Sequence, residues 1–127
     1  MQYKYKGGII MFEYSIKDKM ATITKYNGEE SEVIIPATTF LGDYPVTAIG
    51  EMAFFDCSNL TDITIPDSVT NIGNGAFFNC SNLTSVTFSE NTTELGRSVF
   101  EGTPYQEVID KKEKIRNLKP KNGALQI

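Results

Sequence analysis

The sequence predicts a short solenoid that is mainly β, or α/β, with a β-hairpin at its N-terminal end and a helix at its C-terminal end. Three observations predict this fold. Residues 49–71 and 72–94 agree at 12 of 23 positions, and a third copy begins at Leu95. Alternating apolar residues precede the repeat, and a helix-start signal follows it. A fixed period of this size indicates structural units that bury their apolar faces by stacking.

Residues 1–11 contain basic residues followed by a short apolar run. That run is shorter than the roughly 7–15 apolar residues of a secretory signal peptide. We therefore expect this segment to be disordered, or to be a leader placed by mistake before a true start at Met11. The choice between Met1 and Met11 stays open.

Alternating apolar residues predict antiparallel strands over residues 12–35, of which residues 12–32 form a β cap on the first coil. Lys17-Asp18-Lys19 separates the first two apolar runs, and Asn27-Gly28 separates the second from the third. An Asn-Gly pair between alternating apolar runs is a strong hairpin signal. We therefore expect a hairpin turn at Asn27-Gly28.

The repeats are expected to occupy residues 33–103 of a single domain that spans residues 1–127. Each copy contains a short alternating β segment and one recurring glycine: Gly50, Gly73 and Gly96. A glycine that recurs with the period indicates a positive φ or a close approach of another backbone. Aromatic residues at equivalent positions are expected to form one buried column: Phe54, Phe77 and Phe100.

The first repeat carries an insertion. Pro36 and Val46 are separated by seven more residues than Pro66 and Val69, the equivalent pair in the next repeat. Insertions in repeat proteins lie in loops, often on the binding side. The apolar residues of this loop either form a contact patch or fold back onto the cap: Phe40, Leu41 and Tyr44.

Residues 104–127 are expected to form a helical cap and tail, with the helix over residues 104–119. Thr103, Pro104 and Gln106 make a helix-start signature of the capping-box kind. An apolar stripe at near-helical spacing is expected to cover Val86, Phe88, Leu95 and Phe100 of the last coil. That stripe comprises Tyr105, Val108, Ile109, Ile115 and Leu118.

The distribution of charge argues against nucleic acid as a partner. The chain carries a formal net charge of −4. Residues 12–103 hold 4 basic and 13 acidic side chains, whereas residues 104–127 hold 6 basic and 3 acidic ones. Nucleic acid phosphates need a basic face, and the repeats are acidic. No apolar run approaches the roughly 18 residues of a membrane-spanning helix.

The two cysteines, Cys57 and Cys80, occupy the same position in successive repeats. Equivalent strands in a sheet lie roughly 4.8 Å apart, so the spacing permits a disulfide without requiring one. Two small buried thiols are the simpler interpretation. The chain has no histidine, which disfavours a zinc site and a cysteine nucleophile with a nearby base. We expect no catalytic residue, no metal and no cofactor.

From Phe54 to Phe77 the chain reads Phe-x-x-Cys-x-x-Leu-x-x-Ile-x-Ile-Pro-x-x-Val-x-x-Ile-Gly-x-x-Ala-Phe. This pattern resembles the repeat of the BspA-like leucine-rich repeat family. The resemblance covers residues 33–103 and implies a right-handed leucine-rich-repeat solenoid. It also implies a bacterial or protozoan protein that is secreted or on the cell surface and binds other proteins. Because no signal peptide is visible, a cytoplasmic location stays open.

Two function classes follow, and an enzyme ranks below both. The first is a non-catalytic protein–protein interaction module, adhesive or surface-associated, that is monomeric and binds an unknown protein. The second is a structural unit that self-assembles through the ends of the solenoid. The candidate partner-binding residues are the outward strand positions and the insertion: Glu32, Ile34, Asp62, Thr64, Ser85, Thr87, Phe40, Leu41 and Tyr44.

Overall fold

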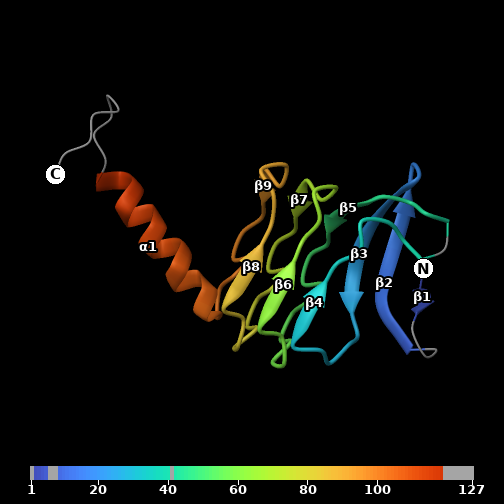
Figure 1. Ribbon diagram of the computed structural model, residues 1–127, viewed down its shortest axis with the longest axis horizontal. Helices are drawn as coiled ribbons and strands as arrows, with labels where there is room; N and C mark the ends of the chain where they lie inside the picture. Colours follow the sequence, from blue (N-terminus) through green and yellow to red (C-terminus); the bar gives the residue numbers. More distant parts are fainter. Residues whose placement is uncertain (1, 6–8, 41, 119–127) are drawn as a thin grey trace.

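The structure is a computed structural model. It describes the backbone of residues 2–5, 9–40 and 42–118 and the side chains of residues 11–40 and 42–114. The described chain forms a mainly β solenoid with antiparallel strands at one end and a single helix at the other (Figure 1). The fold predicted from the sequence is therefore confirmed.

The solenoid is built from two sheets, and each coil contributes one strand to each. The larger sheet, sheet A, runs in the order β1 (Gln2–Tyr5), β2 (Ile9–Lys17), β3 (Met20–Tyr26), β5 (Val46–Ile49), β7 (Asn71–Ile72) and β9 (Glu94–Leu95). The smaller sheet, sheet B, runs in the order β4 (Glu32–Ile34), β6 (Asp62–Thr64) and β8 (Ser85–Thr87). The strands contributed by the repeats pair in parallel, as expected for successive coils.

The N-terminal cap is an antiparallel extension of sheet A alone. Strands β1, β2 and β3 pair antiparallel, and β3 then pairs in parallel with β5. The turn between β2 and β3 is formed by Asp18 and Lys19, both with positive φ. A two-residue hairpin whose twist matches its strands needs such φ values. Residues 2–5 and 9–11, which we expected to be disordered or a misplaced leader, thus lie in strands.

The prediction of a hairpin turn at Asn27-Gly28 is wrong. After Tyr26 the chain leaves sheet A and crosses to β4 in sheet B, and the Asn27 N–H donates to the Met11 carbonyl at 2.6 Å. Gly28 is needed for another reason, because a Cβ there would lie 2.2 Å from the Tyr26 hydroxyl oxygen. Burial of Val33 in the stacked coils decides the path of the chain over the local turn signal.

A column of aromatic rings runs through the core from cap to cap. Phe54 and Phe77 stack at 4.9 Å between ring centroids, and Phe77 and Phe100 stack at 5.5 Å. Tyr26 of the cap stacks on Phe54, and Tyr105 of the helix meets Phe100 edge-on. The predicted column is confirmed and extends beyond the repeats.

The recurring glycines are explained by close approach, since none of them has a positive φ. A Cβ on Gly73 would lie 2.7 Å from the backbone nitrogen of Glu51, and one on Gly96 would lie 2.6 Å from that of Asn74. The left-handed corners lie elsewhere and also recur every 23 residues. They are Met52, Gly75 and Ser98 at one corner, and Asp56, Asn79 and Gly102 at the other.

The helix α1 (Pro104–Leu118) begins where the sequence predicted. The Gln106 N–H donates to Thr103 Oγ1 at 3.1 Å, which caps the first turn. The capping box is not completed, because the Gln106 side-chain amide donates to Asp110 instead of reaching back to Thr103.

The prediction that this helix covers the last coil is only partly correct. Tyr105 is buried and Ile109 is half-buried, but Val108, Phe88 and Leu95 are exposed. Figure 1 shows α1 starting beside β8 and leaning away from the stack. The cap therefore consists mainly of the first helical turn. The side chains of Ile115 and Leu118, predicted to extend the stripe, lie outside the described residues.

Candidate functional site

Six of the candidate partner-binding residues lie together on the outer face of sheet B, which we call the strand face. Each strand turns its central residue inward, so the residues on either side point outward. The register aligns Glu32, Asp62 and Ser85 in one row. A second row consists of Ile34, Thr64 and Thr87.

The strand face is polar except at one position. Ile34 is 77% exposed, whereas Thr64 and Thr87 occupy the same place in the next two coils. Asp62 accepts a hydrogen bond from the Thr61 hydroxyl, which also donates to the Ser31 carbonyl. These contacts hold the Asp62 carboxylate at the boundary between the first two coils.

The insertion forms a short loop at the end of β4. Thr38 and Pro45 form an isolated antiparallel bridge, and the Thr39 N–H donates to the Tyr44 carbonyl at 2.9 Å. The buried Thr39 hydroxyl in turn accepts the Tyr44 N–H at 3.1 Å. The sequence left a contact patch and a folded-back loop open, and the structure divides the two aromatic residues between an exposed and a folded-back position. Phe40 is 68% exposed, whereas Tyr44 is half-buried against the core.

Leu41, the third apolar residue of the insertion, lies outside the described residues.

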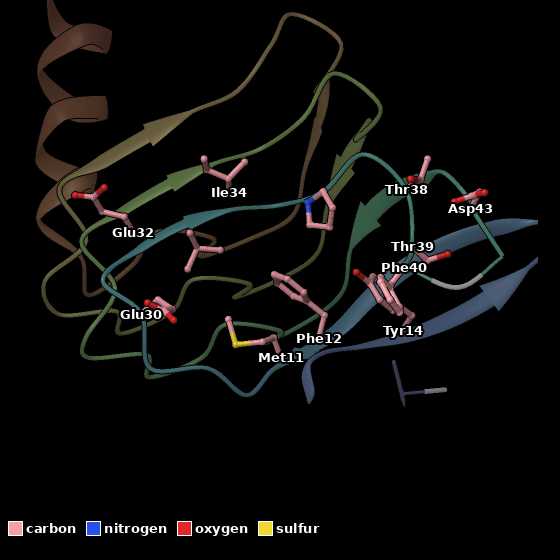
Figure 2. Close-up of a pocket in the computed structure, with 12 residues that line it drawn as sticks. Met11, Phe12, Tyr14, Glu30, Glu32, Ile34, Thr38, Thr39, Phe40 and Asp43 are labelled. Carbon is pink, nitrogen blue, oxygen red and sulfur yellow. The ribbon is translucent and has the colours of Figure 1, made fainter. Parts of the chain in front are cut away.

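A pocket of about 570 Å³ lies between the cap and β4, with the insertion at one end (Figure 2). Met11, Phe12 and Tyr14 of β2 form its apolar wall. On the opposite side it is bounded by Glu32, Val33 and Ile34 of β4, and Phe40 and Asp43 of the loop also line it. The pocket therefore adjoins the strand face and shares Glu32 and Ile34 with it.

The sequence did not predict this pocket. The alternating pattern predicts that Phe12 and Tyr14 are core residues of a strand, and both are buried. What makes them a pocket wall is that β2 belongs to sheet A, whereas β4 opens sheet B. The one sequence feature that pointed to this region was the insertion, whose Phe40 lines the pocket.

The two cysteines are free thiols with different environments. Cys80 is buried and donates through Sγ to the Phe54 carbonyl at 3.0 Å, whereas Cys57 is only half-buried. The prediction of two buried thiols thus holds for Cys80 alone. The Cys80 thiol has one proton, which it can turn from the Phe54 carbonyl to a Cys57 thiolate, and this hydrogen bond lowers the pKa of Cys57 against the opposing effect of burial. The same hydrogen bond and burial raise the pKa of Cys80.

Within the described residues, no group of three or more His, Cys, Asp or Glu side chains is arranged to hold a metal ion. No helix in the described part of the chain is long and apolar enough to cross a membrane. The site is thus an exposed polar face, one exposed aromatic residue and an acidic, partly apolar pocket. Such a surface can bind another molecule.

Comparison with known proteins gives the family. The family described as "BspA type Leucine rich repeat region (6 copies)" matches residues 11–121, which is most of the chain. The protein belongs to the BspA-type leucine-rich repeat family. No protein with a curated description is significantly similar to the chain.

Solved structures of other leucine-rich repeat proteins have a similar fold. A leucine rich cell surface protein from Faecalibacterium prausnitzii A2-165 is 38% identical, with a TM-score of 0.65 over 80% of this chain and 28% of that one. A leucine-rich repeat protein from Bacteroides capillosus is 38% identical, with a TM-score of 0.64 over 70% of this chain and 69% of that one.

A leucine rich repeat protein from T. pallidum is 24% identical and has a TM-score of 0.69 over 79% of this chain and 46% of that one, which shows the fold alone. This BspA-type chain therefore spans less than half the length of the T. pallidum and F. prausnitzii proteins.

Proposed function

We propose that this BspA-type protein is a non-catalytic, surface-associated module that binds another protein through the strand face and the adjoining insertion. The observation that carries the proposal is the register of sheet B, which places six outward side chains in two rows beside the exposed Phe40. An exposed aromatic side chain next to a polar rim is a common arrangement in protein interfaces. The likeness to a cell surface protein from F. prausnitzii supports the proposed location.

The test is affinity capture, in which this protein is the bait and a partner protein is drawn from extracts of cells or of extracellular matrix. The double variant Asp62→Lys with Thr64→Lys reverses the charge at the centre of the strand face. A matched control, Asn71→Lys with Glu94→Lys, makes the same change in charge at exposed, paired residues of β7 and β9 in sheet A. We expect the first variant to lose the captured protein and the control to retain it. Equal capture by both variants would contradict binding through the strand face.

A structural, self-assembling unit is the second candidate. It is favoured by the exposure of Phe88 and Leu95 at the last coil, which α1 does not cover. Exposed apolar side chains beside an open strand edge invite association between chains. Light scattering over a range of protein concentrations separates the candidates. An interaction module stays monomeric, whereas a self-assembling unit grows in mass with concentration.

A further inference from the structure

Within the described part of the chain, strand β4 has an open edge, because the cap extends sheet A but adds no strand to sheet B. On its paired side, the Asp62 N–H donates to the Ser31 carbonyl and the Ile35 N–H donates to the Thr64 carbonyl. Successive peptide groups of a strand point to opposite sides. The N–H and C=O groups of Glu32 and Ile34 therefore point away from β6, toward the open edge.

The open edge is bordered by the pocket of about 570 Å³. A strand placed along β4 at the usual spacing of about 4.8 Å would direct alternate side chains to opposite faces. One set would enter the pocket and contact Met11, Phe12 and Tyr14, all three of which are buried in the free protein. The other set would continue the two rows of the strand face beside Glu32 and Ile34.

Acidic side chains beside β4 select the chemistry of that second set. Glu30, Glu32 and Asp43 line the pocket, and no Lys or Arg does among the residues whose side chains the structure describes. Figure 2 shows Glu30 and Glu32 at the start of β4 and Asp43 in the insertion loop beyond the end of the strand. Cationic side chains on the incoming strand would meet opposite charge at both ends.

We propose that β4 is a strand-addition site, which accepts an extended segment of a partner protein in which apolar residues alternate with Lys or Arg. Backbone hydrogen bonds to Glu32 and Ile34 provide affinity, and the pocket and the acidic residues provide specificity. This inference rests on the proposed function, and it names the part of the partner that is recognised.

The probe is a fluorescein-labelled peptide of alternating Lys and Val, acetylated and amidated at its ends and titrated against the full chain by fluorescence anisotropy. We expect saturable binding. Replacing every Lys by Glu is expected to weaken binding at least about tenfold, since like charges then meet at both ends of β4. In nuclear magnetic resonance spectra, the backbone amide signals of Glu32 and Ile34 are expected to shift on binding.

Two peptides with N-methyl groups on alternate residues test the backbone bonds without altering the protein. One carries them on the Lys residues and the other on the Val residues. Only one of these sets of N–H groups faces β4 in a strand, so one peptide is expected to lose at least about tenfold in affinity and the other to retain it. Equal binding by both peptides would overturn the proposal.

Ile34→Pro is the matching protein variant. It removes the outward N–H but leaves the β4–β6 bonds intact, because Pro is tolerated on the open side of an edge strand. Its control is Ile34→Thr, which keeps the N–H and introduces the residue found at Thr64 and Thr87 in the next coils. Ile34→Pro is expected to weaken binding at least about tenfold more than Ile34→Thr. Similar affinities in two folded variants would count against strand addition.

Self-association that increases with concentration and disappears in Ile34→Pro would identify a second copy as the occupant, and would overturn the proposal. The proposed function is tested separately from this inference. Loss of captured protein in the Asp62 and Thr64 variant, with no peptide binding at β4, would retain the strand face as the interface and reject the edge.

Discussion

Single aromatic side chains connect the coils of this protein. Phe77 is fully buried and has another ring stacked on each side, so one residue links three successive coils. A single coil cannot bury its own apolar face, and its stability depends on such contacts with its neighbours. The outer pair, Phe55 and Phe78, stacks in the same way, but Phe55 is 46% exposed.

Phe77→Ala is expected to cost roughly 3–5 kcal/mol of unfolding free energy, because it removes the ring and leaves a cavity that the stacked coils cannot close. That is enough to unfold much of a small domain of ordinary stability. Phe55→Ala is the matched control and is expected to cost far less. Thermal and urea melts followed by circular dichroism measure both. A melting temperature for Phe77→Ala close to wild type would contradict the placement of this ring.

The two thiols are expected to react differently. Cys57 is half-buried and its pKa is lowered by the hydrogen bond from Cys80, so its reactive thiolate forms at lower pH than in an ordinary cysteine. Cys80 is buried and its pKa is raised. A thiol reagent should label Cys57 in the native protein, at a rate that rises with pH, and Cys80 only after denaturation. Mass spectrometry of Cys57→Ser and Cys80→Ser identifies the labelled site. Equal native labelling of both thiols would be the contrary result.

At the scale of one coil, the corners are held by backbone that lies very close to the next coil. The N–H of Gly73 donates to the Ile49 carbonyl at 2.7 Å, and the Gly96 N–H donates to Ile72 at 2.8 Å. These bonds, repeated from coil to coil, leave no room for a side chain. The neighbouring left-handed corners tolerate Met52 and Ser98 as well as Gly75, so they are less demanding of sequence.

Gly73→Ala is expected to cost about 1–3 kcal/mol, because its Cβ would lie 2.7 Å from a backbone nitrogen that cannot move without shifting a coil. Ser81→Ala, at an exposed turn position, is expected to change stability by no more than about 0.5 kcal/mol. Urea denaturation of both variants measures the difference. If Gly73→Ala were as stable as Ser81→Ala, the coils could not be so closely spaced at this corner.

For the molecule as a whole, the two ends of the solenoid are closed to different degrees. At the N-terminal end the cap continues sheet A and stacks Tyr26 on the column, but leaves β4 open. At the C-terminal end, Tyr105 covers Phe100, and its N–H donates to the Leu83 carbonyl at 3.0 Å. Terminal units of this kind keep repeat proteins soluble.

A chain that ends at Thr103 is therefore expected to self-associate, because Phe100 and the Leu83 carbonyl lose their cover. Light scattering as a function of concentration measures this. The control is Val108→Ser in the full chain, which alters an exposed residue of the same helix and should leave the protein monomeric. A soluble monomeric chain ending at Thr103, with an unchanged melt, would mean that α1 is no cap and that its apolar residues are available to a partner.

Much of the fold was predictable from the sequence, because equivalent residues of successive repeats pack against one another. The 23-residue period predicted the solenoid, the aromatic column and the six residues that share the strand face. Alternation predicted the cap strands, and Thr103-Pro104 predicted the start of α1. Within the repeats one local pattern determines the structure, since the same residue in the next coil lies directly above it.

The tertiary structure decided what the local patterns could not. Asn27-Gly28 looks like a hairpin turn, but the chain crosses there to the other sheet, because Val33 is buried only in the stack. The apolar stripe of α1 likewise does not predict the direction of the helix, and Val108 is exposed. The pocket and the open edge of β4 arise because, among the described residues, a cap that extends sheet A has no counterpart in sheet B. Both features depend on which elements become neighbours in space. The repeat period predicts the packing of the repeated strands but not that of the cap strands.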